Sequence, residues 1–262
     1  MLDKIKKHIK DYFEGENKAA DNSVDFNHDD PCACNVAAEK VVDLYSYDNC
    51  NSETNGEFSF LSFYAKSFSL CFDIGANDGA YSKKILTENP NCHVISFEPN
   101  SDLIDSIREK GVKDVYNVAV ADRDGFIKIN IDKSDDTQSS SFRKNDNTIE
   151  IEVPSITIDS FCEKNKIDKI SFIKIDTEGN ELAVIRGARR IIGENIADFI
   201  QFEYGGTFKD ANIKLGEIFD LMKENYMICH VTSVGLFPLM YSDVLENYRY
   251  SNWVAVSRKV YR

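Results

Sequence analysis

The chain of 262 residues is long enough for one α/β domain, and its formal net charge of −13 limits the partners it can have. Displacing counterions from DNA or RNA needs clustered Lys and Arg, so this charge argues against sequence-independent nucleic-acid binding and against broad attraction to anionic membranes. A hydrophobic content of 42% is enough for a packed core.

The seven cysteines are scattered and lack the paired CxxC spacing of a structural zinc site. Several lie in apolar runs, which is typical of buried, reduced thiols. The sequence shows neither a signal peptide nor an apolar run of membrane-spanning length. We therefore expect a cytoplasmic protein with no bound metal and no stable insertion into a membrane.

The pattern of polar and apolar residues along the chain predicts that it has two parts. Residues 1–57 are expected to form an N-terminal helical and linker segment, because short helical patterns there flank a polar, acidic stretch. Residues 58–262 are expected to form the folded domain.

Apolar runs alternate with helical patterns from about residue 70 onward. This strand–helix–strand repetition predicts an α/β fold with a Rossmann-like, mostly parallel sheet and helices on both faces. One such helix, "SDLIDSIREKG", is expected to begin at Ser101 as its N-cap and to end at Gly111. Two period-two runs, "GFIKINID" and "TIEIEVPS", are expected to be antiparallel additions. Seven strands are expected in the main sheet, at "LCFDIG", "HVISFEP", "VYNVAVAD", "ISFIKID", "DFIQFEY", "YMICHV" and "NWVAVS".

The segment "DIGANDG" directly follows the first strand, at the edge where open α/β sheets bind their ligands. Gly75 allows a tight turn there, and Gly79 lets the next helix begin close by. The dinucleotide-binding pattern GxGxxG has a middle glycine that leaves room for a pyrophosphate. Asn77 occupies that place, so the loop suits a ligand without a pyrophosphate.

Glu98 ends the second strand, nineteen residues after Gly79 and directly before Pro99. A carboxylate at this edge can accept hydrogen bonds from both hydroxyls of a ribose. Together with the glycine loop, it makes S-adenosylmethionine the leading candidate cofactor.

Three more acidic residues are expected at the same edge: Asp176 and Glu178 after "ISFIKI", and Glu203 in "DFIQFEY". They are suited to fixing the ammonium group of the cofactor, orienting a substrate hydroxyl or amine, or binding a divalent cation; Glu178 is also placed to cap the following helix. An alcohol must lose its proton during methyl transfer, and the candidate general bases are Glu178, Glu203 and His230. The alternative for His230 is a buried core histidine.

Several of these motifs together resemble the FkbM-type S-adenosylmethionine-dependent methyltransferases over roughly residues 70–231. They are "DIGANDG", "FEPN", "NVAVADRDG", "SSSF", "VPSITIDSF" and "FIKIDTEGNELAVIRGA". The resemblance implies methyl transfer, usually to oxygen, on sugars, glycans or secondary metabolites. It also implies that the backbone near Val118 and Ala119 contacts the adenine. The positions it implies around the cofactor are Asp73, Gly75, Asn77, Glu98 and Asp176, and Ala76 and Gly79 complete the expected cofactor-binding loop.

Other functions remain open from the sequence. An NAD-dependent oxidoreductase shares the acidic end of the second strand but needs the middle glycine, and a Tyr-x-x-x-Lys pair is absent. A non-catalytic cofactor-binding module is the third reading. The expected partner is a small-molecule or glycan acceptor, and a homodimer is compatible with the sequence.

Overall fold

The structure, a computed structural model, describes residues 48–132, 139–140 and 148–260. The helices expected within residues 1–47 lie outside the described residues. The first helix of the described part is α3 (Glu57–Tyr64), whose first residue is buried. In the described part of the chain, no helix has both the length and the apolar character needed to cross a membrane.

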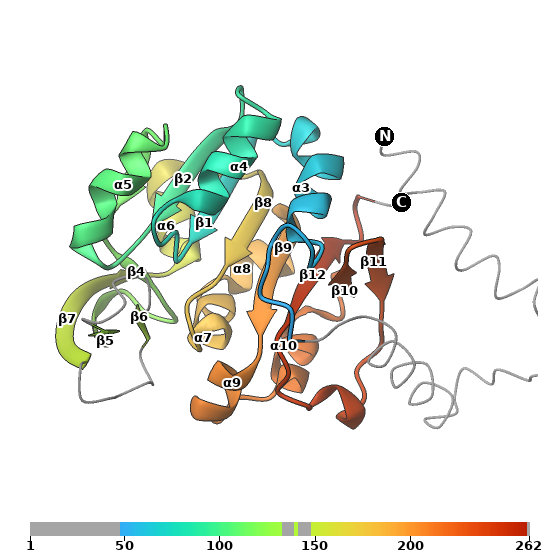
Figure 1. Ribbon diagram of the computed structural model, residues 1–262. Coiled ribbons are helices and arrows are strands. Elements are labelled where there is room, and N and C mark those ends of the chain that lie inside the picture. Colours follow the sequence, from blue (N-terminus) through green and yellow to red (C-terminus); the bar gives the residue numbers. More distant parts are fainter. Residues whose placement is uncertain (1–47, 133–138, 141–147, 261–262) are drawn as a thin grey trace, which may run out of the picture.

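A central sheet runs through the molecule, and its order within the described residues is β11-β10-β12-β9-β8-β1-β2-β3 (Figure 1). Strands β3, β2, β1, β8 and β9 are mutually parallel, whereas β12 runs antiparallel between β9 and β10. Six of the seven expected strands are present, and the third is present only in part. The bounds are β1 (Leu70–Ile74), β2 (His93–Phe97), β3 (Asp114–Tyr116), β8 (Ile170–Ile175), β9 (Ala197–Tyr204), β10 (Tyr226–Thr232), β11 (Gly235–Pro238) and β12 (Ser251–Ser257).

The sequence did not predict strand β11. It is a half-buried edge strand of four residues that pairs antiparallel with β10 after a tight turn. So short a run shows no clear period, and its pairing with β10 defines it as a strand.

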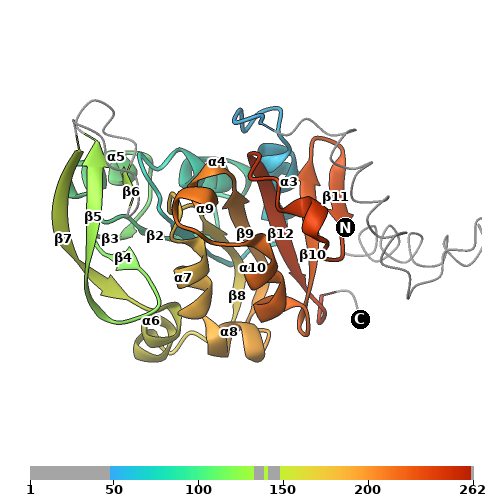
Figure 2. The same ribbon diagram turned by 90° about the horizontal axis from the view of Figure 1, so that it is seen from below.

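Helices cover both faces of the sheet, as the fold class predicts (Figures 1 and 2). One face carries α3, α4 (Ala80–Glu88) and α5 (Ile104–Glu109), whose buried side chains share a cluster with Phe172. The helices that pack on the other face are α6 (Ile158–Asn165), α7 (Glu181–Arg186), α8 (Arg189–Gly193), α9 (Gly206–Asp210) and α10 (Leu215–Met222).

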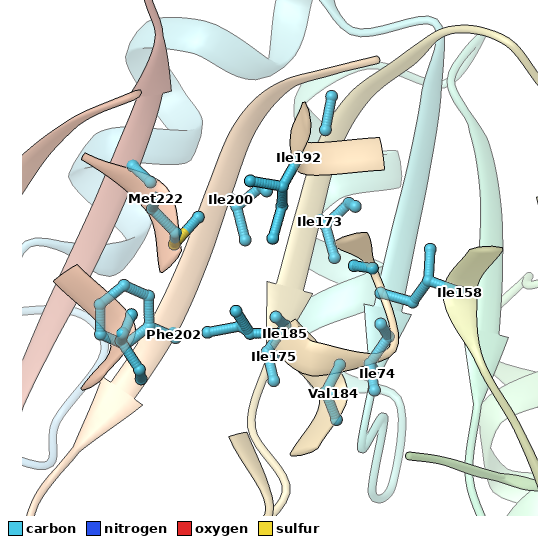
Figure 3. Packing of buried hydrophobic residues seen from close by; sticks show 14 of the residues in the cluster. Ile74, Ile158, Ile173, Ile175, Val184, Ile185, Ile192, Ile200, Phe202 and Met222 are labelled. Carbon is cyan, nitrogen blue, oxygen red and sulfur yellow. The ribbon is translucent and has the colours of Figure 1, made fainter. Parts of the chain in front are cut away.

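The core holds the central strands rigidly. All six residues of β8 are buried, as expected for a parallel strand covered on both faces. Figure 3 shows Ile173 and Ile175 of this strand together with Val184 and Ile185 of α7 in one packed cluster. Each fully buried side chain of this size contributes about 1.5–3 kcal/mol. The carboxyl ends of the strands are therefore held in place by a well-packed core.

A second, smaller sheet has the order β4-β7-β5-β6 and lies at the opposite end of the molecule from β11 (Figures 1 and 2). Its long antiparallel pair confirms the two period-two runs. The expected third strand "VYNVAVAD", by contrast, is not continuous. Asn117 interrupts it by donating from Nδ2 to the carbonyl oxygens of Glu98 and Pro99, both at 2.9 Å, so the chain leaves the main sheet. The bounds are β4 (Ala119–Val120), β5 (Gly125–Asp132), β6 (Ser139–Ser140) and β7 (Thr148–Ile156).

The predicted N-cap of the segment before α5 is wrong by one residue. The side chain of Asn100 accepts from the backbone N–H of Asp102 at 3.1 Å, and a short 3₁₀ turn, η3 (Ser101–Leu103), leads into α5. The predicted end is confirmed, since Gly111 adopts φ 96° just beyond the helix.

Candidate functional site

The loop between β1 and α4 is shaped by residues with positive φ. Gly75 has φ 75°, and a Cβ at this position would lie 1.8 Å from the backbone oxygen of Asp176. Asn77 also adopts a left-handed conformation, φ 52°, which Asn tolerates better than most residues. Gly79, φ 84°, directly precedes α4 and lies against Ile107. Asn77 thus provides the backbone turn without glycine, while adding a side chain.

Glu98 is almost completely buried, 4% exposed, at the end of β2. Its Oε2 accepts from the backbone N–H of Asn77 at 2.9 Å, and its Oε1 accepts from the backbone N–H of Asn100 at 2.8 Å. Burial raises the pKa of Glu98 to about 7, although these two hydrogen bonds act in the opposite direction. A carboxylate offers about four acceptor positions, so two remain for a ligand.

An open cleft of about 690 Å³ lies beyond β1, β2 and β8. Apolar side chains of the main sheet form its floor, and β5 of the small sheet forms one wall. The described residues that line it are Ile74, Gly75, Asn77, Phe97, Glu98, Pro99, Leu103, Val118, Ala119, Val120, Ile127, Ile129, Asp176, Thr177, Glu178 and Asn180.

Asp176 enters this cleft from the end of β8. Its Oδ2 lies 2.6 Å from Nζ of Lys174, a lysine whose side chain is only 8% exposed. Burial opposes the charge of Lys174, but the nearby carboxylates of Asp176, Glu57 and Asp73 raise its pKa above the usual value. Lys174 therefore carries a positive charge beneath the acidic edge and partly neutralises it.

Glu181 shapes the loop that follows Asp176. Its buried carboxylate accepts from the backbone N–H groups of Thr177, at 2.8 Å, and of Gly179, at 3.0 Å, and from the Thr177 hydroxyl at 3.1 Å. These bonds satisfy backbone donors at the start of α7 and fix the turn on which Glu178 lies. Burial raises the pKa of Glu181 to about 7.

Continuing the strand registers by one residue past their last pairs puts five residues in one row across the carboxyl edge of the sheet. At the end of the row the structure pairs Glu203 directly with a residue of β12. Neighbouring strands are about 4.8 Å apart, so the third and fifth members of the row are separated by about 10 Å. The row runs Glu98, Gly75, Asp176, Glu203, Asn252.

Glu203 stands next to Asp176 in this row. Burial, followed by the charges of Asp176 and Glu178, raises the pKa of Glu203. The three carboxylates expected at this edge are therefore close enough to interact. Strand alternation places Asp176 and Glu203 on the face of the sheet that also carries Lys174.

His230 has a different setting. It pairs in register with Trp253, and the two rings lie 5.1 Å apart between centroids. Because successive residues of a strand alternate between faces, Trp253 and its partner point away from the side of the sheet that Asn252 faces. Burial lowers the pKa of His230 to about 4, so the imidazole is neutral. The structure thus separates His230 from the carboxylate row.

The predicted cofactor residues fall into two groups. Gly75, Asn77, Glu98, Val118, Ala119 and Asp176 line the cleft, and so does Glu178. Asp73, Ala76 and Gly79 lie outside its lining and support the loop from behind. Asp73 is fully buried and accepts from Ser82 Oγ at 2.5 Å. Of the serine run, Ser139 and Ser140 form β6, and the rest lies outside the described residues.

The sequence reasoning missed Lys174, Glu181 and a buried polar network. In that network Gln201 accepts from the Tyr81 hydroxyl at 2.7 Å and donates from Nε2 to Glu57 at 2.8 Å. Polar residues inside otherwise apolar strands were the available signal, because such groups need buried partners.

In the described residues, no group of three or more His, Cys, Asp or Glu side chains is arranged to hold an ion. The cysteines of the described part are free thiols, four buried and Cys50 exposed. Cys32 and Cys34 lie outside it.

The cleft suits an adenosine ligand without a pyrophosphate. Glu98 has acceptor positions left for ribose hydroxyls, and Val118, Ala119 and Ile129 offer an apolar slot for a flat base. Asp176 adds a carboxylate for a cationic group. The left-handed turn at Asn77 carries a side chain where a pyrophosphate-binding loop needs open space.

Comparison with known proteins agrees with this geometry. The Methyltransferase FkbM domain family matches residues 73–226. A 2-O-methyltransferase, NoeI from Sinorhizobium fredii (strain NBRC 101917 / NGR234), is 26% identical over 182 residues, which cover 62% of this chain and 74% of NoeI.

Solved methyltransferase structures share a distant likeness with the chain. The plantazolicin methyltransferase BpumL in complex with SAH aligns with a TM-score of 0.46 at 11% identity and covers 85% of this chain and 91% of its own. The O-methyltransferase from Bacillus cereus, also in complex with SAH, aligns with a TM-score of 0.41 at 11% identity and covers 92% and 96%.

The family match spans more than half of the chain and includes every described residue that lines the cleft. This match decides against the NAD-dependent oxidoreductase that the sequence had left open. The chain belongs to the FkbM methyltransferase domain family and is an S-adenosylmethionine-dependent methyltransferase.

Proposed function

We propose that the enzyme transfers the methyl group to a hydroxyl of a sugar, glycan or other small polar acceptor. The observation that carries this proposal is the gathering of Asp176, Glu178 and Glu203 at the ends of β8 and β9, where the methionine part of the cofactor would lie. Carboxylates there can orient a hydroxyl group and take its proton. The relative named as a 2-O-methyltransferase supports oxygen as the accepting atom.

The cofactor would be held by residues from three strand ends. Glu98 would accept from the ribose hydroxyls, and the slot at Val118 and Ala119 would take the adenine. Asp176, with Lys174 beneath it, would bind the ammonium group of the methionine part. When bound, S-adenosylmethionine supplies an electrophilic methyl group with a good leaving group, so alignment is the main contribution required of the protein.

Glu178 is the base we favour. The raised pKa of Glu203 means that this group holds its proton more firmly than an ordinary carboxyl, so it is suited to orienting the acceptor. Glu178 lines the cleft itself and lies on the turn that Glu181 fixes. The hydroxyl proton would pass to Glu178 as the oxygen bonds to the methyl carbon. His230, on the other face of the sheet, is the less favoured candidate.

A transfer assay with radiolabelled S-adenosylmethionine tests the proposal. The acceptors are free hexoses, nucleotide sugars, oligosaccharides and small amines, and calorimetry with S-adenosylhomocysteine checks in parallel that the cofactor site is competent. We expect label in hydroxyl acceptors. Label confined to amines contradicts an oxygen acceptor, and failure to bind the homocysteine compound contradicts the proposed cofactor site.

A further inference from the structure

A second pocket lies at the same edge of the sheet, beyond the carboxylate row. It occupies about 540 Å³ at the carboxyl end of β10 and the start of β12. Its described lining is Asn49, Thr54, Asn55, His230, Val231, Thr232, Ser233, Tyr250, Ser251 and Asn252. All of these positions fall outside residues 73–226, the range that matches the family.

The segment before α3 forms one wall of this pocket and is attached at both ends. At one end, Asp48 donates its backbone N–H to the Tyr250 carbonyl at 3.0 Å, accepts from the Tyr250 N–H at 3.1 Å, and pairs with Arg249 at 2.9 Å. At the other end, Gly56 has φ 105°, and a Cβ there would lie 2.4 Å from the backbone of Thr232. The wall is therefore built into the fold.

Tyr250 and Asn252 join the pocket to the carboxylate row. Asn252 pairs with Glu203 in register, and its Nδ2 donates to the Tyr250 hydroxyl at 3.2 Å. Burial and then the charge of Glu203 raise the pKa of Tyr250, so the phenol keeps its proton and can donate a hydrogen bond. A ligand at Asn252 would thus lie about two strand spacings from Asp176 and one from Glu203, about 10 Å and about 5 Å across the sheet.

The chemistry of the lining selects a neutral, hydroxyl-rich ligand. Among the described residues, no Asp, Glu, Lys or Arg side chain lines the pocket; apart from His230 and Val231, the lining residues carry amides, hydroxyls and one phenol. A phosphate would need Arg or Lys, and an ammonium group would need a carboxylate in contact. Amides and hydroxyls both donate and accept, as a sugar ring requires.

We propose that this pocket, the acceptor pocket, binds a neutral sugar and so determines which acceptor is methylated; this inference rests on the proposed function. Tyr250 and Asn49 are its specificity-determining residues. The sugar lies against β12 and the segment before α3, with one hydroxyl directed toward Glu203 and Asp176.

The proposal is tested by saturation-transfer NMR on the full chain, in the presence of enough S-adenosylhomocysteine to fill the cofactor site. The probes are methyl β-D-glucopyranoside, methyl β-D-galactopyranoside and methyl α-D-mannopyranoside, with D-glucosamine as the cationic probe. Wild type is expected to bind at least one methyl glycoside in preference to D-glucosamine. Tyr250→Phe and Asn49→Ala should each weaken that binding about three- to tenfold, the loss of one hydrogen bond. Calorimetry should show S-adenosylhomocysteine affinity within twofold of wild type.

Two matched variants complete the experiment. Asn91→Ala, at an exposed turn before β2 on the opposite edge of the sheet, should change neither affinity. Gly56→Ala should displace the wall and abolish glycoside binding while the cofactor site stays intact.

The outcomes separate the two proposals. If the homocysteine compound does not bind wild type, the proposed function fails and this inference fails with it. If it binds but no methyl glycoside does, if D-glucosamine binds better, or if Tyr250→Phe and Asn49→Ala bind glycosides like wild type, the acceptor pocket alone is overturned.

Discussion

The two halves of the sheet's carboxyl edge are built in different ways. In the cofactor half, at β1, β2 and β8, the shape depends on contacts with the backbone. Gly75 packs against the Asp176 carbonyl, and the carboxylates of Glu98 and Glu181 accept hydrogen bonds from backbone N–H groups of their loops. In the acceptor half, at β9, β12 and β10, backbone contacts also hold the upstream segment in place, but the lining comes mainly from polar residues of that segment, of the end of β10 and of the start of β12.

The two halves also differ in how the family match covers them. The cofactor half lies within the matched residues, and its close backbone packing leaves little room for change. The acceptor pocket lies outside them, where side chains can be exchanged without disturbing the loops that hold the cofactor. A constant reaction can in this way be combined with different acceptors.

The largest effect is expected where the two halves meet. Replacing Glu178 with Gln keeps the shape of the side chain but removes the base, so kcat should fall about 10²- to 10⁴-fold. The affinity for S-adenosylhomocysteine should stay within about threefold of wild type. Steady-state kinetics with any acceptor found by the transfer assay, combined with calorimetry, measures both.

The matched control for this prediction is Glu109→Gln, at an exposed position on α5. It should leave kcat unchanged. Glu203→Gln and His230→Asn complete the set. A loss of kcat confined to His230→Asn would transfer the role of base to the other face of the sheet and contradict our choice of Glu178.

The substitution Gly75→Ala tests the close backbone packing of the cofactor half. The new methyl group would overlap the Asp176 backbone oxygen, at 1.8 Å in the present geometry, and φ 75° disfavours any residue with a Cβ. We expect a loss of unfolding free energy of at least about 3 kcal/mol, measured by urea denaturation, and no detectable cofactor binding.

Gly193→Ala is the comparison for that variant. Gly193 ends α8, and among the described residues no atom beyond its immediate neighbourhood lies within 4 Å of the position of a new Cβ. Its stability should change by no more than about 1 kcal/mol, since Ala favours helices over Gly. Equal losses for the two variants would show that the close approach at Gly75 is not what the cofactor half depends on.

The same contrast explains what could be predicted from the sequence. Glu98, Asp176 and Glu203 were found because parallel strands end at one edge, so a residue at a strand's end has a known location. The antiparallel pair β5 and β7 was predicted from its period-two alternation, whereas its place in a separate small sheet that walls the cleft was not.

The acceptor half was beyond this reasoning for physical reasons. Tyr250 and Asn252 reach the edge from the beginning of an antiparallel strand, and its position between β9 and β10 cannot be read from chain order. The face occupied by His230 was equally hidden, because every residue of β10 is buried and no alternation marks the two sides. Glu181 resembled an ordinary acid in a helix's first turn, and its role appears only in its hydrogen bonds.

The smallest effect expected is a pH dependence that belongs to the cofactor half alone. Burial raises the pKa of Glu98 to about 7 in the folded protein, above the usual value of 4.5. Its ionised fraction rises from about one-tenth at pH 6 to about nine-tenths at pH 8, and ribose hydroxyls donate best to the ionised form. The affinity for S-adenosylhomocysteine, measured by calorimetry, should therefore rise by up to about tenfold across this range.

The stability of the ligand-free protein should respond in the opposite direction. A carboxyl whose pKa is raised by folding stabilises the protein fully below pH 4.5, and this contribution is lost as pH rises through 7. Glu181 adds to the same trend without lining the cleft, so melting temperature alone cannot isolate Glu98. Glu98→Gln should bind weakly and remove the pH dependence of affinity, whereas Glu109→Gln should retain it. If Glu98→Gln kept the full pH dependence, the titrating group would lie elsewhere, and the ribose would lose its assigned partner.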